Sequence, residues 1–542
     1  MKERGKHLHL VTTWALTLLA IAGIFLPIAH ANDAEHLDRR LAEALARAGF
    51  TGTVQSSLES RLGRPLQPAL VDLGRLVFFD NILGLHMDNS CAGCHSPAAG
   101  FGDTQSIAIG TDNNGLAGPD RTGPRNQRRA PMMLNAAFYP RLMLNLRFAS
   151  IAHNPFDLSE GVRVPFTVGG TTVWRPGSAC IYGTCFDPAT MTTLLTVQGH
   201  MPSTEMVEMA GFSAENPGNV DPRLYHPPHL VSSGAIADTV PGPIPGPNGS
   251  PPDSTDTSYS IRHKVLDRFN ANQTYIDKFA AIYPAAIGGN LTFAMIGAAL
   301  AEFQMSNTYV TAPLDRFARG ERRAMTPQQK RGALLFFEKA QCVACHTVAG
   351  QSNEMFSDFG NHVAGIPQIA PKAFGLKPGG NPLNPDDFPG NVLFAGPNQD
   401  EDFGLEEFTG DPVDRYRFRT SPLRNLELQP TYFHNGAFTR LEDALRYHVN
   451  TLRMAPTYDP AAAGVDADLT VRRGPSGPVL QRLDPRIVAL GNLQLSQQEF
   501  ADLLAYVRDG LLDPGARPAN LCKQIPTVVP SSLPVITFQG CP

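Results

Sequence analysis

Cys91-Ala-Gly-Cys94-His95 and Cys342-Val-Ala-Cys345-His346 are the two stretches that fix the architecture of this chain. Both have the form C-x-x-C-H, the attachment pattern of c-type haem. Two thiols at this spacing bond the vinyl groups of one porphyrin, and the histidine turns beneath the ring to bind the iron. The sequence therefore predicts two covalently bound haem c groups, with His95 and His346 as iron ligands.

Zinc binding and dithiol redox chemistry are the competing interpretations of these motifs. Zinc-binding C-x-x-C pairs usually lie about 15–20 residues apart, whereas these two lie in opposite halves of the chain. A thioredoxin-type dithiol needs no histidine after its second cysteine, and we do not expect it twice. Both alternatives therefore explain the sequence less well than haem does.

The other four cysteines allow three pairings. By proximity, Cys180–Cys185 would close a tight loop and Cys522–Cys541 would pin the C-terminal tail. Both pairings are hypotheses about structure.

Residues 1–31 have the pattern of a secretory signal. A basic start is followed by an apolar run over 11–28 and by the small-x-small sequence Ala29-His30-Ala31. An uncleaved membrane anchor is the alternative, because the run is nearly long enough to span a bilayer. We expect cleavage after about Ala31, export to an oxidising compartment, and no membrane span in the mature chain.

The composition is that of a globular chain with many loops. The 542 residues include 49 Gly and 47 Pro, and the formal net charge of −5 gives no sign of nucleic-acid binding. Apolar periodicity and capping signals predict helices. They cover 34–48, 68–79, 130–138, 261–282, 291–307 and 326–340, and capping boxes open further helices at Thr439–Glu442 and Ser496–Glu499.

A helix followed by C-x-x-C-H recurs once in each half. We therefore expect a mainly α fold of two cytochrome-c-like helical domains, each with one covalent haem and with long irregular loops and insertions. The expected divisions are 32–310, with an insertion at about 154–257, then 311–515, and a disulfide-pinned tail at 516–542.

Several stretches in this order resemble the bacterial di-haem cytochrome c peroxidases. That superfamily includes the maturation enzyme of methylamine dehydrogenase. The matching stretches are Leu73–Asp80, Cys91–His95, Arg129–Phe138, Arg331-Gly332, Cys342–His346, Phe418–Asn425 and Tyr432–Gly436. The resemblance covers most of residues 65–510.

The resemblance implies a periplasmic enzyme that reduces hydrogen peroxide to water at the N-terminal haem. Electrons would enter through the C-terminal haem from a small cytochrome or cupredoxin. Heterolytic cleavage of the O–O bond needs a proton moved between the two oxygens, and a distal carboxylate can relay it. The family places a Glu in a Val-Glu-Met sequence for this role, which corresponds to Glu208, and Gln198 precedes it at the family spacing. Glu205 and His200 are the competing candidates.

The axial ligands depart from the family pattern. Many relatives carry a histidine shortly after an Ile-Gly pair, but no histidine stands between His95 and His153 here. We therefore expect an N-terminal iron that is open or water-bound in the resting state. At the C-terminal haem, His448 falls at the sixth-ligand position, with Tyr447 and Met454 as alternatives. Adjacent helical residues point about 100° apart, so only one of His448 and Tyr447 can face the iron.

The residues between the haems depart as well. Leu144 stands where the family has its inter-haem tryptophan, and Trp174 lies in the inserted region, so we expect no tryptophan bridge. The nearby aromatic candidates are Phe138, Tyr139 and Phe148, for each of which core packing is the alternative.

The polar positions around the haems complete the comparison with the family. Arg129 falls at the family's calcium-binding Asn, so calcium is a possible cofactor only. Arg419 and Arg424 are candidate partners of haem propionates, with salt bridges as the alternative, and His434 is expected to pack.

Three functions fit these features. The first is a di-haem peroxidase. The second is a di-haem oxidase or oxygenase acting on a partner protein or an organic substrate. The insertion favours this function because it could shape the access of a substrate to the haem pocket. The third is an electron carrier, which an open first haem with Glu208 argues against.

Overall fold

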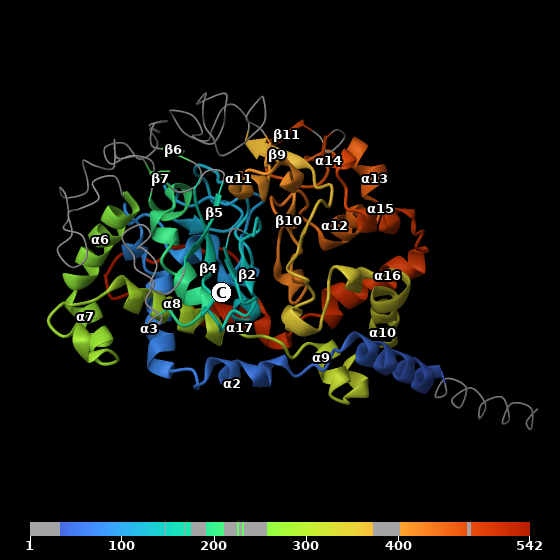
Figure 1. The fold of residues 1–542 in the computed structure, drawn as a ribbon, viewed down its shortest axis with the longest axis horizontal. Helices are drawn as coiled ribbons and strands as arrows, with labels where there is room; N and C mark the ends of the chain where they lie inside the picture. The colour runs from blue at the N-terminus through green and yellow to red at the C-terminus, as the bar shows by residue number, and fades with distance from the viewer. Residues whose placement is uncertain are drawn as a thin grey trace, which may run out of the picture.

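The computed structural model describes residues 33–146, 148–167, 170–174, 191–210, 225–226, 230–231, 257–371, 401–473 and 478–542. Helices dominate this part of the chain, as predicted (Figure 1). None of its helices has the length and hydropathy of a membrane span. The expected signal at 1–31 and the proposed Cys180–Cys185 pair lie outside the described residues.

The helices of the first half surround the first C-x-x-C-H turn. After a helix over residues 33–48 they are α2 (Leu58–Leu62), α3 (Pro68–Phe79), α4 (Cys91–Cys94), α5 (Leu194–Gln198), α6 (Thr257–Asn270), α7 (Gln273–Ala280) and α8 (Phe293–Ser306). Short 3-10 turns η3 (Pro97–Ala99) and η4 (Ala136–Phe138) and a π-helical turn η6 (Met206–Ala210) lie between them.

The helices of the second half surround the second motif. They are α9 (Pro313–Ala318), α10 (Pro327–Leu334), α11 (Glu406–Thr409), α12 (Leu441–His448), α13 (Thr451–Met454), α14 (Pro478–Gln481), α15 (Pro485–Asn492), α16 (Gln497–Ala505) and α17 (Pro518–Leu521). The motif itself begins with a 3-10 turn, η12 (Cys342–Ala344).

The strands form small sheets between the helices. The largest has the order β2-β3-β4-β5 and is antiparallel, with β2 (Arg141–Leu142), β3 (Phe148–Ser150), β4 (Val162–Thr167) and β5 (Gly170–Trp174). The two-stranded pairs are β1 (Leu116–Ala117) with β12 (Thr537–Phe538), β6 (Tyr225–His226) with β7 (Leu230–Val231), β8 (Asn361–His362) with β10 (Phe418–Arg419), and β9 (Gln368–Pro371) with β11 (Leu469–Arg473).

A glycine lies where two helices cross closely beside each motif. In the first half a Cβ on Gly74 of α3 would lie 1.8 Å from the carbonyl oxygen of Ala299 on α8. In the second half a Cβ on Gly332 of α10 would lie 2.0 Å from the carbonyl oxygen of Asp502 on α16. Only glycine lets two helical backbones approach this closely. The stretches Leu73–Phe79 and Arg331–Phe337 therefore build equivalent crossings.

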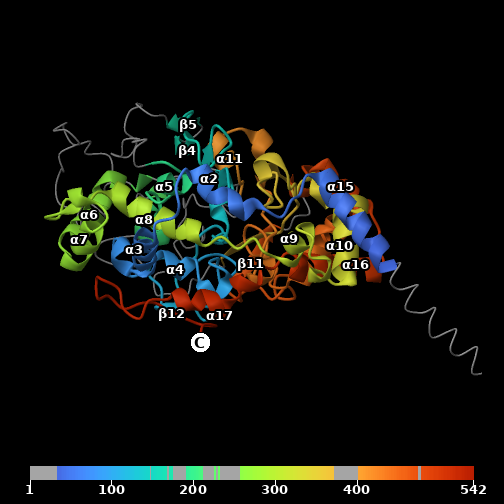
Figure 2. The same ribbon diagram turned by 90° about the horizontal axis from the view of Figure 1, so that it is seen from below.

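The two ends of the described chain are exchanged between the halves. Leu41 and Leu45 of the first helix pack in the second half's core with Leu314 and Phe317. The chain's last residues run back beneath the first half instead, where Phe538 packs against Phe79 (Figure 2). The first helix thus packs with the second half, although the expected division assigned it to 32–310, and the separately expected tail at 516–542 packs against the first half.

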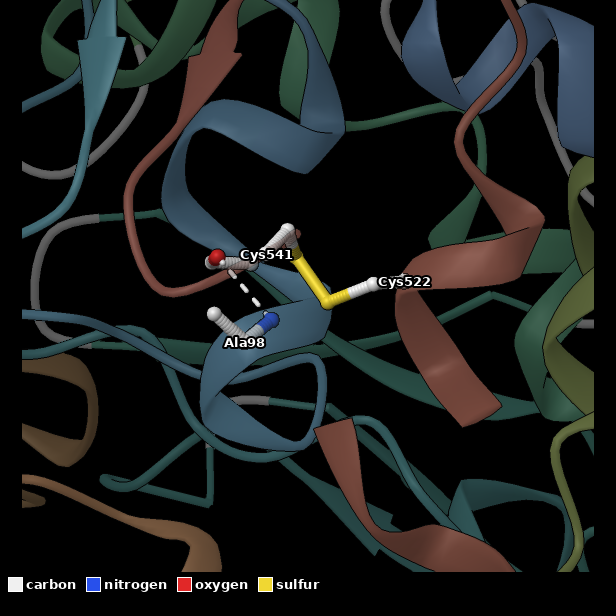
Figure 3. Close-up of a disulfide and its surroundings, with 4 residues drawn as sticks. Ala98, Cys522 and Cys541 are labelled. Carbon is white, nitrogen blue, oxygen red and sulfur yellow. Dashed lines mark hydrogen bonds between the residues drawn. A yellow bond between two sulfur atoms is a disulfide. The ribbon is translucent and has the colours of Figure 1, made fainter. Parts of the chain in front are cut away.

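The disulfide Cys522–Cys541 holds this returning tail in place. It closes over 19 positions, and it lies beside Ala98 of η3, just after the first motif (Figure 3). The strand pair β1–β12 adds backbone bonds, including one from the Gln539 amide to the Ala117 carbonyl of 2.8 Å. The predicted Cys522–Cys541 pairing is confirmed.

Two local predictions were wrong. The stretch 130–138 contains only the 3-10 turn η4, because Asn135 takes a left-handed conformation with φ of 65°. The capping box at Thr439 does not form, since its hydroxyl donates to the Ala463 carbonyl and α12 begins at Leu441. The Ser496–Glu499 box is present as predicted.

Candidate haem sites

The first motif forms a compact turn that presents one imidazole. The His95 amide donates to the Cys91 carbonyl at 2.9 Å, which closes the helical turn. The His95 Nδ1 lies 3.1 Å from the Phe101 carbonyl oxygen. A histidine that donates from Nδ1 keeps Nε2 as a ligand atom, and burial lowers the pKa of His95 so that the ring stays neutral. The ring is thus prepared to ligate a metal.

The thiols of the first motif are unpaired. Burial raises the pKa of Cys91 and Cys94 to about 12. After burial and nearer charges, the negative charge of Glu208 also contributes to raising the pKa of both thiols. Glu208 is partly buried in η6, and the sequence prediction thus falls on a carboxylate beside the first motif.

Neighbouring candidates have different surroundings. The Glu205 carbonyl accepts from the amides of Glu208, Met209 and Ala210, so its backbone shapes the turn that carries Glu208. Gln198 is the last residue of α5. His200 is fully buried with its ring 5.7 Å from that of Phe293, and burial lowers its pKa to about 4. These contacts give His200 a packing role.

The second motif presents a second imidazole opposite its own. The His346 Nδ1 lies 2.9 Å from the Phe356 carbonyl oxygen, as in the first motif. The ring centres of His346 and His448 are 6.4 Å apart, with an angle of 72° between the planes. A metal–imidazole bond is about 2 Å long and the ring nitrogen lies about 1 Å from the ring centre, so two trans imidazoles on one metal have ring centres about 6 Å apart. The observed spacing fits.

The alternatives to His448 are engaged elsewhere. The Tyr447 hydroxyl donates to the Gly365 carbonyl at 2.5 Å, and its ring packs against Phe438. Met454 ends α13 at the margin of the second core. His448 is held neutral, because burial and then the neighbouring His346 lower its pKa to about 4. Its buried Nδ1 has no hydrogen-bond partner among the described residues.

Two predicted propionate partners differ sharply. Arg424 is fully buried in a bidentate pair with Asp315, with both N–O distances 2.8 Å, so its charge is already matched within the protein. Arg419 is also buried, and among the described residues its guanidinium donates to the Arg141 carbonyl at 2.9 Å and forms no ion pair. Its Nε has no partner there, and burial lowers its pKa to about 10. A buried cation of this kind calls for an anion.

An aromatic pair lies where the two halves meet. The rings of Tyr139 and Phe359 are 5.2 Å apart, and the Arg419 guanidinium lies 5.5 Å and 5.9 Å from their centres. The Leu144 carbonyl accepts from the Arg419 amide at 2.8 Å. Trp174 is at the far strand of the sheet, paired with Val162. Phe138 and Phe148 lie in the same core cluster as Tyr139.

Arg129 joins the halves at the position where calcium was considered. Its guanidinium donates to the Thr431 carbonyl and to the Gln429 side chain. Its amide donates to the carbonyl of His434, whose ring stacks on Phe418 at 3.6 Å. A fixed positive charge therefore already binds these oxygens.

These residues fit two haem groups. Four thiols are unpaired, two motif histidines hold their rings through Nδ1, one further imidazole stands at the trans spacing, and one buried guanidinium lacks an anion. The thioether bonds, the iron ligands and the calcium remain predictions.

A family model described as "Di-haem cytochrome c peroxidase" matches residues 68–323. Over this range the chain is similar to the di-haem cytochrome c peroxidases, and its relatives are oxidoreductases of that kind. It is 24% identical over 412 residues to cytochrome-c peroxidase IdrP2 of Denitromonas iodatirespirans, covering 75% of this chain and 80% of that protein. It is 23% identical over 389 residues to the methylamine utilization protein MauG of Methylorubrum extorquens, covering 71% and 70%.

A solved structure, that of a MauG-like protein associated with microbial copper homeostasis, aligns with a TM-score of 0.49. The sequence identity is 20%, and the alignment covers 83% of this chain and 91% of that one. The sequence relatives thus include both cytochrome c peroxidases and MauG.

Proposed function

We propose that this di-haem oxidoreductase is a periplasmic peroxidase that reduces hydrogen peroxide to water at the first haem. Electrons enter through the second haem from a small cytochrome or cupredoxin. The observation that carries the proposal is the asymmetry of the ligand sets. His448 stands opposite His346, whereas among the described residues the ring contact of His95 is with Phe78 and with no second imidazole.

Each residue has a part in the proposal. Cys91, Cys94, Cys342 and Cys345 bind the two haem groups, and His95, His346 and His448 ligate the irons. When bound, haem supplies the iron that accepts oxidising equivalents from peroxide. Arg419 offers its unmatched charge to a propionate.

Glu208 is the acid–base group of the proposed reaction. Its carboxylate takes a proton from one peroxide oxygen and returns it to the other, so that the second oxygen leaves as water. Gln198 donates a hydrogen bond in the same pocket. This role is supported by the place of Glu208 in the turn whose carbonyl accepts from Asn89 Nδ2 at 2.8 Å, since that same Nδ2 lies 3.9 Å from the Cys94 sulfur.

Two measurements test the proposal. The resting protein should show one low-spin and one high-spin haem by absorbance and EPR, and it should consume peroxide with a reduced donor without prior reduction. A resting spectrum with two low-spin haems, or no peroxide consumption, contradicts it. His448→Met should raise the potential of the second haem alone, since a Met ligand raises haem potentials.

The match to MauG keeps an oxidation of a partner protein or an organic substrate as the second candidate. Slow peroxide consumption without donor oxidation, together with a modified partner, would favour that candidate over the peroxidase.

A further inference from the structure

Asn89 lies two residues before Cys91 and is 1% exposed. Its Nδ2 donates to the Glu208 carbonyl at 2.8 Å and lies 3.9 Å from the Cys94 sulfur. Its Oδ1 accepts from the Arg121 guanidinium at 2.9 Å. One buried amide thus joins the turn that carries Glu208, a haem-attachment cysteine and a buried cation.

Arg121 extends this connection to a second loop. Its Nε donates to the Ile109 carbonyl at 2.7 Å, and its Nη2 donates to the Gly110 carbonyl at 2.9 Å. The Cys94 sulfur lies 3.3 Å from the same Ile109 oxygen. Asn89 and Arg121 therefore form a hub, by which we mean this bonded pair of side chains, and it binds both the loop at 109–110 and the turn at 206–210.

Gly93 gives independent evidence that this hub is tightly built. A Cβ at Gly93 would lie 2.1 Å from the Asn89 Oδ1 and 3.0 Å from the Arg121 Nη2. Any side chain there displaces the hub. The corresponding residue of the second motif is Ala344, which is exposed, so the C-x-x-C-H turn itself does not require glycine at this position.

We propose that Asn89 is a positioning residue that fixes Glu208 over the first haem through its backbone. The inference rests on the proposed function. Within η6 the amides of residues 208–210 all donate to the Glu205 carbonyl, and the carbonyls of Glu208 and Met209 point out to Asn89 and to the Leu85 amide. Of these two donors, Leu85 uses its backbone amide and Asn89 uses its side chain, so a substitution can remove only the Asn89 bond. A proton relay needs its carboxylate held within hydrogen-bond reach of both oxygens.

Asn89→Asp is the sharpest test, because it keeps the size of the side chain and the oxygen that Arg121 binds. It replaces the donor to Glu208 by an oxygen, which repels the carbonyl. We expect kcat for peroxide to fall roughly 10- to 100-fold, with KM for the donor and the spectrum of the second haem unchanged. Amide hydrogen exchange over 205–210 should rise. Gly93→Ala should give the same pattern by displacing Asn89.

Asn425→Asp and Ala344→Gly are the matched controls. Asn425 is a buried asparagine whose Nδ2 donates to the Tyr309 carbonyl at 3.1 Å, away from Glu208. Both controls should leave turnover and exchange over 205–210 unchanged.

The outcomes separate the two proposals. Unchanged turnover in Asn89→Asp overturns the positioning role, whether or not exchange rises. A fall in turnover with unchanged exchange over 205–210 also overturns it. If the wild-type chain consumes no peroxide, the proposed function fails, and hydrogen exchange alone decides whether Asn89 fixes the turn. If Asn89→Asp does not fold, Gly93→Ala replaces it, because that variant displaces Asn89 without changing any polar group.

Discussion

Around the first motif, Ala92 and Gly93 are buried, and a Cβ on Gly93 would meet Ile536 of the returning tail at 3.1 Å. At the second motif, Ala344 in the corresponding position is exposed. The two C-x-x-C-H turns have nearly the same backbone hydrogen bonds and partly buried cysteines and histidines, but the residues between the cysteines are covered in the first and more open in the second. A covered site favours chemistry that excludes water, and an exposed one favours electron entry from a partner.

The polar side chains around the two motifs differ as well. The first motif has Asn89, Arg121 and Glu208 around it, whereas the second has His448 across from its own histidine. The local turn thus sets haem attachment, and the neighbouring segments set what each site can do.

Replacement of Glu208 should have the largest effect, because it changes the proposed proton relay at the first motif. Glu208→Gln removes the proton relay while keeping the size of the side chain, so kcat should fall roughly 10²- to 10⁴-fold. Both haems should stay attached, and the second haem should be reduced by a donor at the wild-type rate. Glu205→Gln is the control, since it keeps the Glu205 backbone carbonyl that shapes the turn. A larger loss in the control would transfer the relay to Glu205.

The sequence could predict what depends on local spacing. The two motifs follow from the spacing of cysteine and histidine, and the helix at Pro68–Phe79 and the cap at Ser496 follow from periodicity and capping. The sequence pattern could not predict partners brought together by long-range packing. Nothing local indicates that Asn89 meets Glu208, that Arg424 is neutralised by Asp315, or that the first helix packs in the second half. Gly93 illustrates the difference, because its glycine is visible in the sequence but the crowding that requires it is seen only in the structure.

Loss of the disulfide should affect the first site and spare the second. The Cys522→Ser, Cys541→Ser double variant opens a loop of 19 positions, which we expect to cost about 3 kcal/mol in the free energy of unfolding of the first half. Urea unfolding monitored by the absorbance of each haem measures the effect. Equal destabilisation at both haems would show that the tail does not selectively cover the first motif.

Folding stability should fall as pH rises through the titration of one buried carboxyl group between the halves. Arg128 bonds Asp402 and Glu407 at 2.5 Å each across the interface. Burial, opposed by Arg128, raises the pKa of Glu407 from 4.5 to about 7. A carboxyl group with a raised pKa in the folded state stabilises it fully below the unfolded pKa and loses that contribution as pH rises through the folded pKa.

We therefore expect the free energy of unfolding to fall between pH 4.5 and 7 through this group. Thermal unfolding of Glu407→Gln across that range should show a flatter pH dependence than the wild type. Glu406→Gln, which alters only the neighbouring pair with Arg415, should keep the wild-type slope. An unaltered slope in Glu407→Gln would place the titration elsewhere.

The smallest effect expected is on communication between the two sites. The His95 ring is bonded to the Phe101 carbonyl, which also accepts from the Met133 amide at 3.0 Å. The Tyr139 hydroxyl donates to the adjacent Leu134 carbonyl at 3.0 Å. Phe359, against the Tyr139 ring, follows Asp358, whose amide donates to the Cys345 carbonyl at 2.8 Å. These contacts connect the covered motif to the open one without tryptophan.

Phe359→Leu removes one ring from this connection, and electron transfer between the haems should slow roughly tenfold, which corresponds to about 1.4 kcal/mol in activation free energy. The measurement is the decay of the second haem's reduced absorbance after one-electron-reduced protein is mixed with excess peroxide. Phe359→Tyr keeps the ring and should keep the rate. Tyr458→Phe removes a hydroxyl that donates to the Ala437 carbonyl in the second half, and it should have no effect. A wild-type rate in Phe359→Leu, with both haem potentials unchanged, would mean that electrons cross between the covered and open sites by a route that avoids this aromatic pair.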